Sequence, residues 1–273
     1  LGLAPTDIAT VDDLPKWPVL DKSEMMEDAI ANPPYGTYTA VDDDIWKSRG
    51  WMLFSSSGST GVPRVFRYTH VDRAYWEWAN ARAMWSMDIR PGDVLFPISG
   101  FGPHVFVWGV EVAANRMNLA VIPGGGMDGK ARASIIERFN PTVLVCTPSY
   151  ALYLGRVMQE MDKDPAATSV RWIITGGEPF SGVEGTLERI QDLWGAMSLE
   201  FYGCTEASPH CGGYSCPEYQ AGDEPFIHLM EDIQVWETVD PESRQPVAEK
   251  ERGLTVCTNL NSESSPQLRF LVG

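Results

Sequence analysis

A run of small polar residues at positions 55–64 (SSSGSTGVPR) is the part of this sequence best suited to binding chemistry. Its hydroxyl groups and the backbone N–H groups around its glycines can surround an anion such as phosphate. A flexible surface turn is the alternative for so polar a stretch taken alone. The stretch is not a Walker-type P-loop, because Gly61 is followed by Val62 and Pro63 instead of lysine and a hydroxyl residue.

The composition limits the partners that such a site can serve. The 273 residues include 37 acidic and 21 basic residues, which gives a formal net charge of −16. This charge repels nucleic acid and anionic lipid, so we expect neither nucleic acid nor a membrane as a partner. Five cysteines, an odd number, favour a reducing compartment over a disulfide framework. No apolar run has the length of a membrane span, and we expect a cytoplasmic protein.

Alternating strand-like and helix-like segments follow the polar loop and must position it. The alternation predicts an α/β fold, a layered parallel-sheet core with flanking helices. A strand-turn-strand pattern from residue 227 predicts a C-terminal antiparallel β segment. Residues 1–50 contain several prolines and are expected to form an irregular arm. The predicted parallel strands are residues 94–97, 119–123, 142–147, 170–175 and 199–202.

A helix is predicted directly after the polar loop. Thr69 and Asp72 have the spacing of a capping box, which marks a helix start. Apolar residues then recur at helical spacing, and we interpret this stripe as part of the core. The stripe consists of Val71, Tyr75, Trp78, Ala81 and Trp85.

Glycine-rich or polar loops follow several of the predicted strands. In open α/β sheets, ligands bind at the carboxyl ends of the strands. The convergence of these loops at one edge therefore indicates a ligand site more strongly than any single loop does. The loops are residues 124–126, 147–149, 176–178 and 203–206.

The motifs together resemble those of one enzyme family. Residues 56–63 (SSGSTGVP) resemble the phosphate loop of the adenylate-forming enzymes, residues 175–178 (TGGE) their G-G-E element, and residues 202–206 (YGCTE) their Y-G-x-[TS]-E motif. Residues 121–126 (VIPGGG) and 146–154 (CTPSYALYL) are similar to the phenylacetate–coenzyme A ligase branch. The similarity runs from the first residues to the last.

The resemblance implies that residues 1–273 are an incomplete N-terminal AMP-binding domain. Within it we expect an arm at 1–50, an α/β core at 51–205, and a metal-binding loop with a β segment at 206–273. Residues 266–273 match the beginning of a family segment whose aspartate holds the ATP ribose. We therefore expect that aspartate, and the C-terminal domain with its assisting lysine, to be absent from this sequence.

The implied activity is that of an acid–thiol ligase. An aromatic (aryl or arylalkyl) carboxylic acid is activated with ATP as an acyl-adenylate, and coenzyme A then forms the thioester. The domain alone is expected to be incomplete for full turnover. Two alternatives stay open: an adenylation domain that loads a carrier protein, and a zinc-stabilised nucleotide-binding module without catalysis. A homodimer is also possible.

The resemblance assigns the nucleotide-binding residues. Thr60 and Thr205 would place hydroxyls near phosphate, and Glu206 would bind Mg²⁺. Tyr202 would stack on the adenine, although a buried strand tyrosine is the alternative. Many relatives have a lysine at or near the position after the loop proline, where this chain has Arg64. The Arg64 guanidinium can still bind phosphate. The remaining nucleotide-binding candidates are Ser56, Ser57, Gly58, Ser59, Gly61, Gly176, Gly177, Glu178 and Gly203.

The acid is expected to bind at the turn that contains Ser99, Phe101 and His104. Apolar walls from Phe101, Trp108 and Ile122, with little positive charge, suit an aromatic acid. His104 can contact the carboxylate, and a structural role at a helix start is the alternative.

Cysteine and histidine residues after position 206 are compatible with a tetrahedral structural zinc site, because thiolates and imidazoles are its usual ligands. Some relatives in this branch carry a zinc ion there. Cys211 competes for a place among the ligands, and a group of unrelated reduced residues is the alternative. The preferred ligands are His210, Cys216, His228 and Cys257.

Overall fold

The computed structural model describes residues 4–56, 63–179, 183, 185–207, 209, 211–220 and 226–272. The chain divides into two compact units. Unit 1 consists of Leu1–Tyr75, Cys204–Ser208 and Met230–Gly273, and unit 2 of Trp76–Gly203 and Pro209–Leu229. These bounds differ from the predicted division at residues 50 and 205, because both ends of the chain contribute to unit 1.

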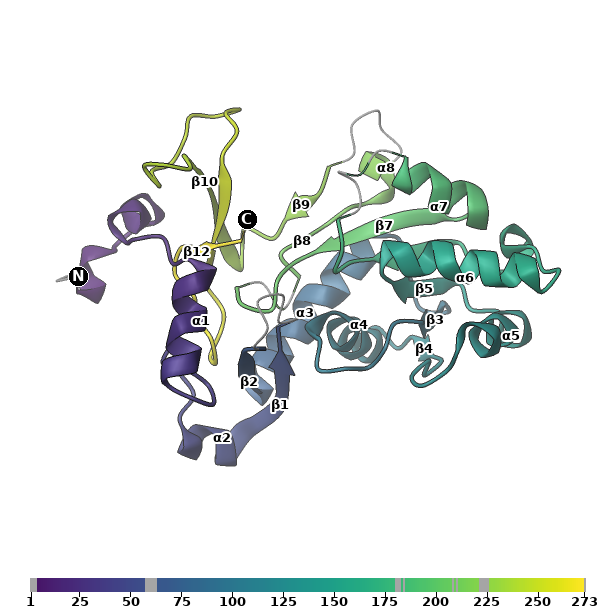
Figure 1. Ribbon diagram of the computed structural model, residues 1–273, viewed down its shortest axis with the longest axis horizontal. Helices are drawn as coiled ribbons and strands as arrows, with labels where there is room; N and C mark the ends of the chain where they lie inside the picture. The colour runs from purple at the N-terminus through teal and green to yellow at the C-terminus, as the bar shows by residue number, and fades with distance from the viewer. Residues whose placement is uncertain are drawn as a thin grey trace. The chain divides into compact units, whose positions relative to one another are not determined.

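Unit 2 is built on a seven-stranded sheet with the order β4-β3-β5-β6-β7-β8-β9 among the described residues. The strands β4, β3, β5, β6 and β7 are parallel, whereas β8 and β9 are antiparallel additions at one edge. The predicted parallel sheet is therefore confirmed (Figure 1). The strands are β3 (Val94–Pro97), β4 (Ala120–Val121), β5 (Val143–Cys146), β6 (Trp172–Thr175), β7 (Met197–Tyr202), β8 (Gly213–Tyr214) and β9 (His228–Leu229).

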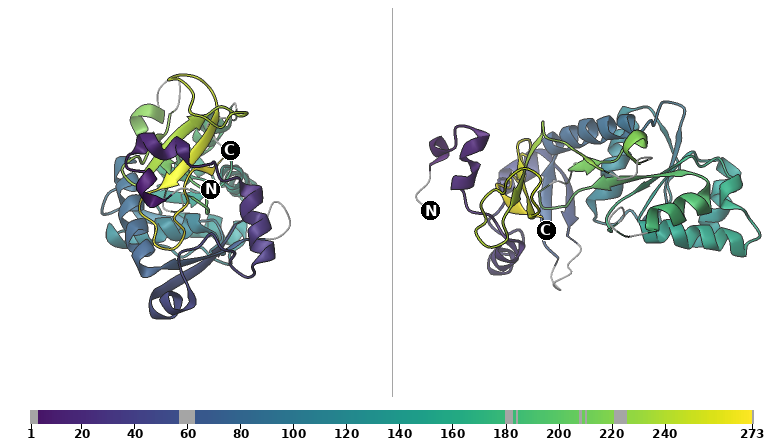
Figure 2. Two further views of the ribbon diagram at one scale, coloured as in Figure 1. Left: turned by 90° about the vertical axis from the view of Figure 1, so that its left-hand side faces the viewer. Right: turned by 90° about the horizontal axis from the view of Figure 1, so that it is seen from above.

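Helices flank this sheet. The connections that contain α5, α6 and α7 lead across the sheet from β4 toward β7. The connection from β3 to β4, which contains α4, leads in the opposite direction. Since parallel crossovers are right-handed, α4 covers the opposite face. Figure 2 gives further views of these elements. The helices are α4 (Val105–Arg116), α5 (Gly129–Phe139), α6 (Pro148–Glu160), η3 (Pro165–Ala167), α7 (Thr186–Trp194) and α8 (Pro217–Gln220).

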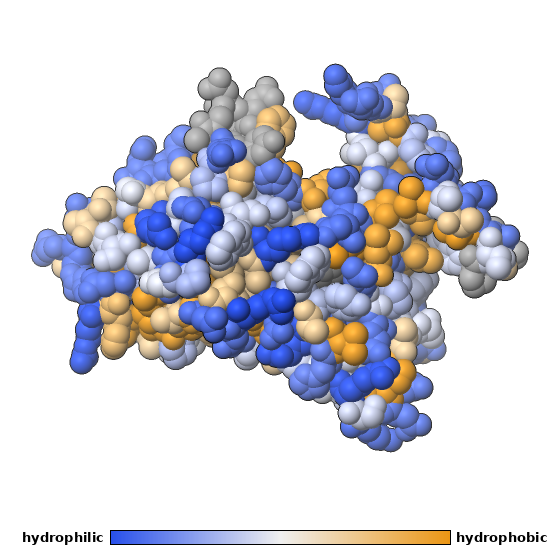
Figure 3. All heavy atoms as spheres, turned by 180° about the vertical axis from the view of Figure 1, so that it is seen from behind, coloured by the Kyte–Doolittle hydropathy of each residue, from blue (hydrophilic) through white to orange (hydrophobic). Residues whose placement is uncertain are grey.

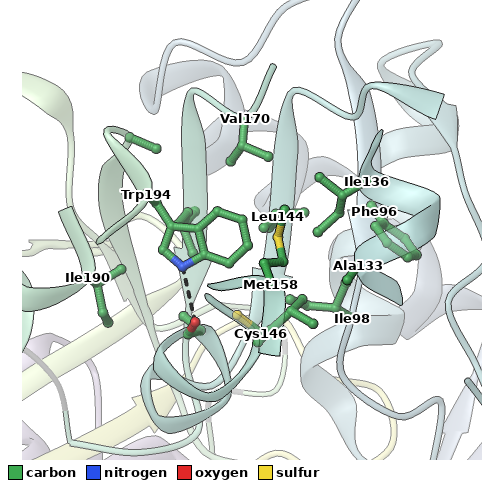
Figure 4. Close-up of a cluster of buried hydrophobic side chains, with 14 residues drawn as sticks. Phe96, Ile98, Ala133, Ile136, Leu144, Cys146, Met158, Val170, Ile190 and Trp194 are labelled. Atoms are coloured by element: carbon green, nitrogen blue, oxygen red, sulfur yellow. Dashed lines mark hydrogen bonds between the residues drawn. The ribbon is translucent and has the colours of Figure 1, made fainter. Parts of the chain in front are cut away.

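The main core of unit 2 lies between the sheet and α5, α6 and α7 (Figure 4). All four residues of β5 are buried, as expected for a strand covered on both faces. Trp194 of α7 fills the space beside α6, and its indole N–H donates to the carbonyl of Ala151 at 3.0 Å. A side chain at Gly155 would lie 2.4 Å from Leu193 Cδ2, so this glycine permits the close approach of α6 and α7.

Asp93 joins the amino ends of three strands of the sheet. Its buried carboxylate accepts hydrogen bonds from the Arg90 N–H at 2.9 Å, the Thr142 hydroxyl at 2.6 Å and the Arg171 guanidinium at 2.9 Å. Burial raises the pKa of Asp93, but these donors together hold it below its ordinary value. The carboxylate therefore stabilises the fold above its unfolded pKa, and this stabilisation is lost as the pH falls through the folded pKa.

D93N is expected to reduce the free energy of unfolding by about 1–3 kcal/mol at pH 7, because donors in a buried site lose their charged acceptor. Urea titrations measure this loss, with D192N at an exposed position of the same unit as the control. The difference from the wild type should shrink as the pH falls below about 4. A constant difference down to pH 2 would contradict this account.

Unit 1 contains an antiparallel hairpin of β1 and β2 and a three-stranded antiparallel sheet, β10-β11-β12, among the described residues. The predicted C-terminal antiparallel segment is thus confirmed. Residues 1–50 are more regular than expected, since Asp21 and Asp42 cap two helices that the prolines obscured in the sequence. The elements are η1 (Pro5–Asp7), η2 (Val11–Lys16), α1 (Lys22–Ala31), α2 (Asp43–Arg49), β1 (Gly50–Ser55), β2 (Val65–Thr69), β10 (Gln234–Val239), β11 (Leu254–Asn259) and β12 (Phe270–Leu271).

Helix α3 (His70–Ser86) begins in unit 1 at the predicted capping box. The N–H of Thr69 donates to Asp72 at 2.9 Å, and the N–H of Asp72 donates to the Thr69 hydroxyl at 3.4 Å. Asp72 also accepts the N–H of Glu263 at 2.9 Å, so the start of the helix is joined to the loop before β12.

The predicted core stripe of α3 is wrong, because its large side chains are exposed. Alanine and aromatic residues occur all around this helix, so periodicity alone fitted two faces and indicated the wrong one. Arg82 instead stacks on Trp78 at 4.3 Å from the ring centre. Apolar side chains also lie among hydrophilic ones on the face in Figure 3. The exposed residues are Val71, Tyr75, Trp78 and Trp85, and the buried ones Trp76, Ala79, Ala81, Ala83 and Met84.

Within the described part of the chain, no helix combines the length and apolar character that crossing a membrane requires.

Candidate active site

The ends of the polar loop meet in unit 1, between β1 and β2. The N–H of Ser56 donates to the carbonyl of Arg64 at 3.0 Å, and the N–H of Arg64 donates to the Ser56 hydroxyl at 3.2 Å. This reciprocal pair closes the base of the loop one step beyond the Ser55–Val65 strand pair. The predicted phosphate-binding residues Ser57, Gly58, Ser59, Thr60 and Gly61 lie outside the described residues.

The side chain of Arg64 faces the interior of unit 1. It is 2% exposed, lies 4.7 Å from the ring centre of Phe66, and donates from Nη2 to the carbonyl of Tyr38 at 2.9 Å. Burial lowers the pKa of Arg64, while the nearby Tyr68 and acidic groups oppose this shift. In this arrangement the guanidinium fastens the end of the loop to the segment around Tyr38. The sequence indicated the charge of Arg64 but not the direction in which its side chain points.

Thr205 and Glu206 lie in a turn of unit 1 that is held from several sides. The Tyr68 hydroxyl donates to the carbonyl of Thr205 at 2.7 Å, and Asn259 donates to the carbonyl of Ala207. Burial raises the pKa of Tyr68 well above its ordinary value, so this hydroxyl remains a donor. Glu206 is 5% exposed, and its Oε1 lies 2.9 Å from Nζ of Lys22 at the start of α1.

The nucleotide candidates in unit 2 lie at the carboxyl ends of β6 and β7. Gly176 leaves no room for a side chain, because a Cβ would lie 3.0 Å from both Phe106 and the carbonyl of Phe201. Gly177 has a φ of +80°, which favours glycine. Glu178 accepts the Ser149 hydroxyl at 2.9 Å.

Tyr202 ends β7, is half-buried, and its carbonyl accepts the N–H of Gly212 at 2.8 Å. Tyr202 and Gly203 belong to unit 2, whereas Cys204, Thr205 and Glu206 belong to unit 1. The predicted Y-G-x-T-E motif is therefore divided between the two units along the chain.

An aromatic wall borders the predicted acid-binding turn in unit 2. Phe101 meets Trp108 edge-on with 5.2 Å between ring centres, and the Trp108 indole donates to the carbonyl of Gly102 at 3.0 Å. Ser99 is half-buried and its N–H donates to the carbonyl of Val145 at 3.3 Å. His104 is the exposed N-cap residue of α4, and its side chain makes no capping hydrogen bond.

The predicted zinc ligands are only partly brought together. In unit 2, Cys216 Sγ lies 3.2 Å from His228 Nε2. Cys257 instead belongs to β11 of unit 1, with its Sγ 3.9 Å from the carbonyl of Ala207. Cys211, the competing ligand, is buried, and its thiol donates to the carbonyl of Gly213 at 3.1 Å. His210 lies outside the described residues.

Across the described ranges, no three histidine, cysteine or acidic side chains lie close enough together to hold a metal ion. The described residues therefore give the zinc site no support beyond the Cys216–His228 pair, and the site stays a prediction. The sequence spacing gave no sign that Cys257 belongs to unit 1 and the Cys216–His228 pair to unit 2.

The comparisons with known proteins decide the family. A model of the AMP-binding enzyme family matches residues 9–257. The chain belongs to this family. Within it, the phenylacetate-coenzyme A ligase of Thermus thermophilus is 28% identical over 272 residues, which are 100% of this chain and 58% of that protein. The corresponding ligase of Escherichia coli is 28% identical over 270 residues, 98% of this chain and 58% of that protein.

A solved structure is similar over the whole chain. The open conformation of 2-hydroxyisobutyryl-CoA ligase, in complex with 2-HIB-AMP and CoA, has a TM-score of 0.89 and 28% identity, and it covers 100% of this chain and 62% of that one. The chain therefore lies in the phenylacetate–coenzyme A ligase-like branch of the adenylate-forming enzymes. It spans 58% of the length of the two phenylacetate-coenzyme A ligases named above.

The Glu206 carboxylate has the donor chemistry that the predicted Mg²⁺ ion of bound ATP would require. Mg²⁺ usually takes one or two carboxylates and completes its coordination with phosphate oxygens and water. A single buried carboxylate is therefore enough at this position. Its ion pair with Lys22, which sequence reasoning missed, means that any metal ligation competes with or shares the lysine contact.

R64M is expected to lower the free energy of unfolding by about 1–3 kcal/mol, because the hydrogen bond to Tyr38 and the ring contact are lost. ATP affinity should fall as the loop loosens, but the dependence of log Kd on log salt concentration should stay unchanged. K47M, at an exposed site of unit 1, is the control. A reduced salt dependence in R64M or R64K would instead indicate direct contact with phosphate.

Proposed function

We propose that the chain takes part in the ATP-dependent activation of an aromatic carboxylic acid and its transfer to coenzyme A. The observation that carries the proposal is the buried Glu206 carboxylate in the tightly held turn that follows Tyr202 and Gly203. The overall likeness to a ligase solved with an acyl-adenylate and CoA supports the same chemistry.

In the first step a carboxylate oxygen of the acid attacks the α-phosphorus of ATP. An oxygen–phosphorus bond forms, the bond to the β-phosphate oxygen breaks, and pyrophosphate leaves. Two anions must approach each other, so the protein contributes positioning and charge neutralisation. The Thr60 and Thr205 hydroxyls and the loop N–H groups would hold phosphate oxygens. Mg²⁺ bound at Glu206 would neutralise phosphate charge.

In the second step the thiol of coenzyme A attacks the acyl carbon, a thioester forms, and AMP leaves with the original carboxylate oxygen. Tyr202, Gly176, Gly177 and Glu178 would border the adenine. The thiol proton is released as the thioester forms, and AMP leaves as the phosphate monoester anion. A carrier protein as the acceptor, a homodimer and the non-catalytic module stay predictions, and no observation favours them.

The aromatic wall supports an aryl or arylalkyl acid. Phe101 and Trp108 are in edge contact, and Phe106 lies 6.2 Å from Phe201 between ring centres, so aromatic side chains cluster beside this turn. The names of the relatives give phenylacetate, which is aromatic, and 2-hydroxyisobutyrate, which is not. Ser99 and His104 would contact the carboxylate end.

Exchange of labelled pyrophosphate into ATP tests the proposal on the natural protein. We expect exchange that depends on phenylacetate or benzoate and is weaker with acetate and 2-hydroxyisobutyrate. The strongest exchange with acetate would contradict the aromatic assignment. ATP binding without exchange for any acid would contradict activation and favour the nucleotide-binding module.

A further inference from the structure

Arg132 is a buried cation at the carboxyl edge of the unit 2 sheet that the motifs did not indicate. It lies in the first turn of α5, is 7% exposed, and its Nη2 donates to the carbonyl of Gly124 at 3.1 Å. Its Nη1 donates to the hydroxyl of Tyr150, in the first turn of α6. The guanidinium thus joins the loop after β4 to the first turn of α6, which directly follows β5.

The Arg132 guanidinium also lies 5.0 Å from the ring centre of Tyr150, whose hydroxyl accepts its hydrogen bond. Its Nε is buried and has no hydrogen-bond partner in the described part of the chain. Its described partners are neutral oxygens, so its charge is not balanced by an ion pair. A buried charge without an opposite charge is unfavourable for stability. The hydrogen bonds of Arg132 therefore have to offset the cost of burying its charge, which leaves a small net contribution to stability.

Gly124 lies where the loop after β4 packs closely on its neighbours. A side chain at Gly124 would lie 2.1 Å from the carbonyl of Pro97, so the loop after β4 packs directly on the end of β3. A Cβ at the neighbouring Gly125 would lie 3.6 Å from Phe101 of the aromatic wall. A shift of this loop is therefore transmitted to the proposed acid-binding turn.

The contact chain continues to the loop after β6. Next to Tyr150, the N–H and hydroxyl of Ser149 donate to Glu178 at 3.2 and 2.9 Å. The pKa of Cys146, the last residue of β5, is raised by burial and further by Glu178, and lowered by Arg132. Arg132 and Glu178 thus both lie near the end of β5.

We propose that Arg132 is a positioning residue that sets the loops after β4, β5 and β6 for acid activation. It holds the Gly124 carbonyl and the Tyr150 hydroxyl in one place, and the adjacent Ser149 holds Glu178. Arg132 acts through these groups and does not itself contact the reacting atoms. The inference rests on the proposed function of this site.

The test compares R132M, R132K and Y150F with R138M, which changes an exposed arginine of the same helix. Hydrogen exchange followed by mass spectrometry reads peptides that cover residues 120–128, 146–154 and 172–179. In R132M we expect about tenfold faster exchange in these peptides, because local opening becomes easier when the joining hydrogen bonds are lost. R132K has one ammonium group in place of the branched guanidinium, so its hydrogen-exchange rates should lie between those of R132M and the wild type.

Pyrophosphate exchange gives the functional readout. In R132M, kcat/KM for the preferred acid should fall by about 10- to 100-fold, because the aromatic wall is displaced. The ratio of kcat/KM between the preferred acid and the other acids should become smaller for the same reason. The melting temperature should fall only by the few degrees that R64M also loses, because removal of a buried charge offsets part of the lost hydrogen bonds. Y150F should produce a smaller change of the same kind.

Two outcomes overturn the inference in different ways. The role of Arg132 is overturned, while the proposed function stands, if hydrogen exchange in all three peptides of R132M equals that of the wild type. The same holds if the activity of R132M falls only in proportion to its melting temperature. Wild-type protein that supports no pyrophosphate exchange with any acid overturns the proposed function and the role of Arg132 together.

Discussion

E206Q is expected to weaken ATP binding about 100-fold in the presence of Mg²⁺ and to change it little in its absence. The glutamine keeps the size of the side chain but loses the charge that a hard divalent cation requires, and a metal contact of this kind is worth several kcal/mol. Titration calorimetry of the natural protein, with and without Mg²⁺, measures both affinities. The difference between the two conditions is the signature of a metal ligand.

K22M is the matched control for E206Q. It removes the ion pair at 2.9 Å while leaving the Glu206 carboxylate in place. We expect Mg²⁺-dependent ATP affinity to stay within about threefold of the wild type, since a partly exposed lysine contributes little by itself. Equal weakening of ATP binding by E206Q with and without Mg²⁺ would indicate that Glu206 acts only through the folding of its turn.

R269M is expected to produce the largest loss of stability. Arg269 is 1% exposed, and its Nε donates to Glu237 Oε2 at 3.0 Å in a buried ion pair. Its Nη1 and Nη2 donate to the carbonyls of Trp17 at 2.5 Å and Arg244 at 3.2 Å. Removing one member of such a pair leaves a buried charge unpaired and costs about 3–5 kcal/mol. Urea unfolding measures the loss.

The double variant R269M/E237L separates the ion pair from simple packing. Because it removes both charges together, it should recover much of the stability that R269M loses. A double variant as unstable as R269M, or a loss below about 1 kcal/mol in R269M, would contradict a decisive role for the pair.

The sequence was sufficient for the parallel sheet of unit 2. The strands β3, β5 and β6 are short, largely apolar runs between polar loops, and this pattern depends on local composition alone. The capping box of Thr69 and Asp72 was likewise predictable, because its partners lie three residues apart. The polar loops were correctly expected at the carboxyl ends of these strands.

Contacts between distant segments were not predictable in the same way. The pairing of Lys22 with Glu206 and of Arg132 with Gly124 depends on how the elements pack, and neither has a local pattern. The buried face of α3 was misjudged for the same reason. The inward direction of Arg64 follows from its contact with Tyr38, which precedes it by 26 residues.

The central claim is that the acid is activated as an acyl-adenylate, and transfer of the carboxylate oxygen tests it most directly. The natural protein is supplied with ATP, coenzyme A and phenylacetate, or the acid preferred in pyrophosphate exchange, carrying ¹⁸O in both carboxylate positions. Mass spectrometry of the products should find one ¹⁸O atom in AMP for each thioester formed. Unlabelled AMP, or formation of ADP and labelled inorganic phosphate, would contradict the account.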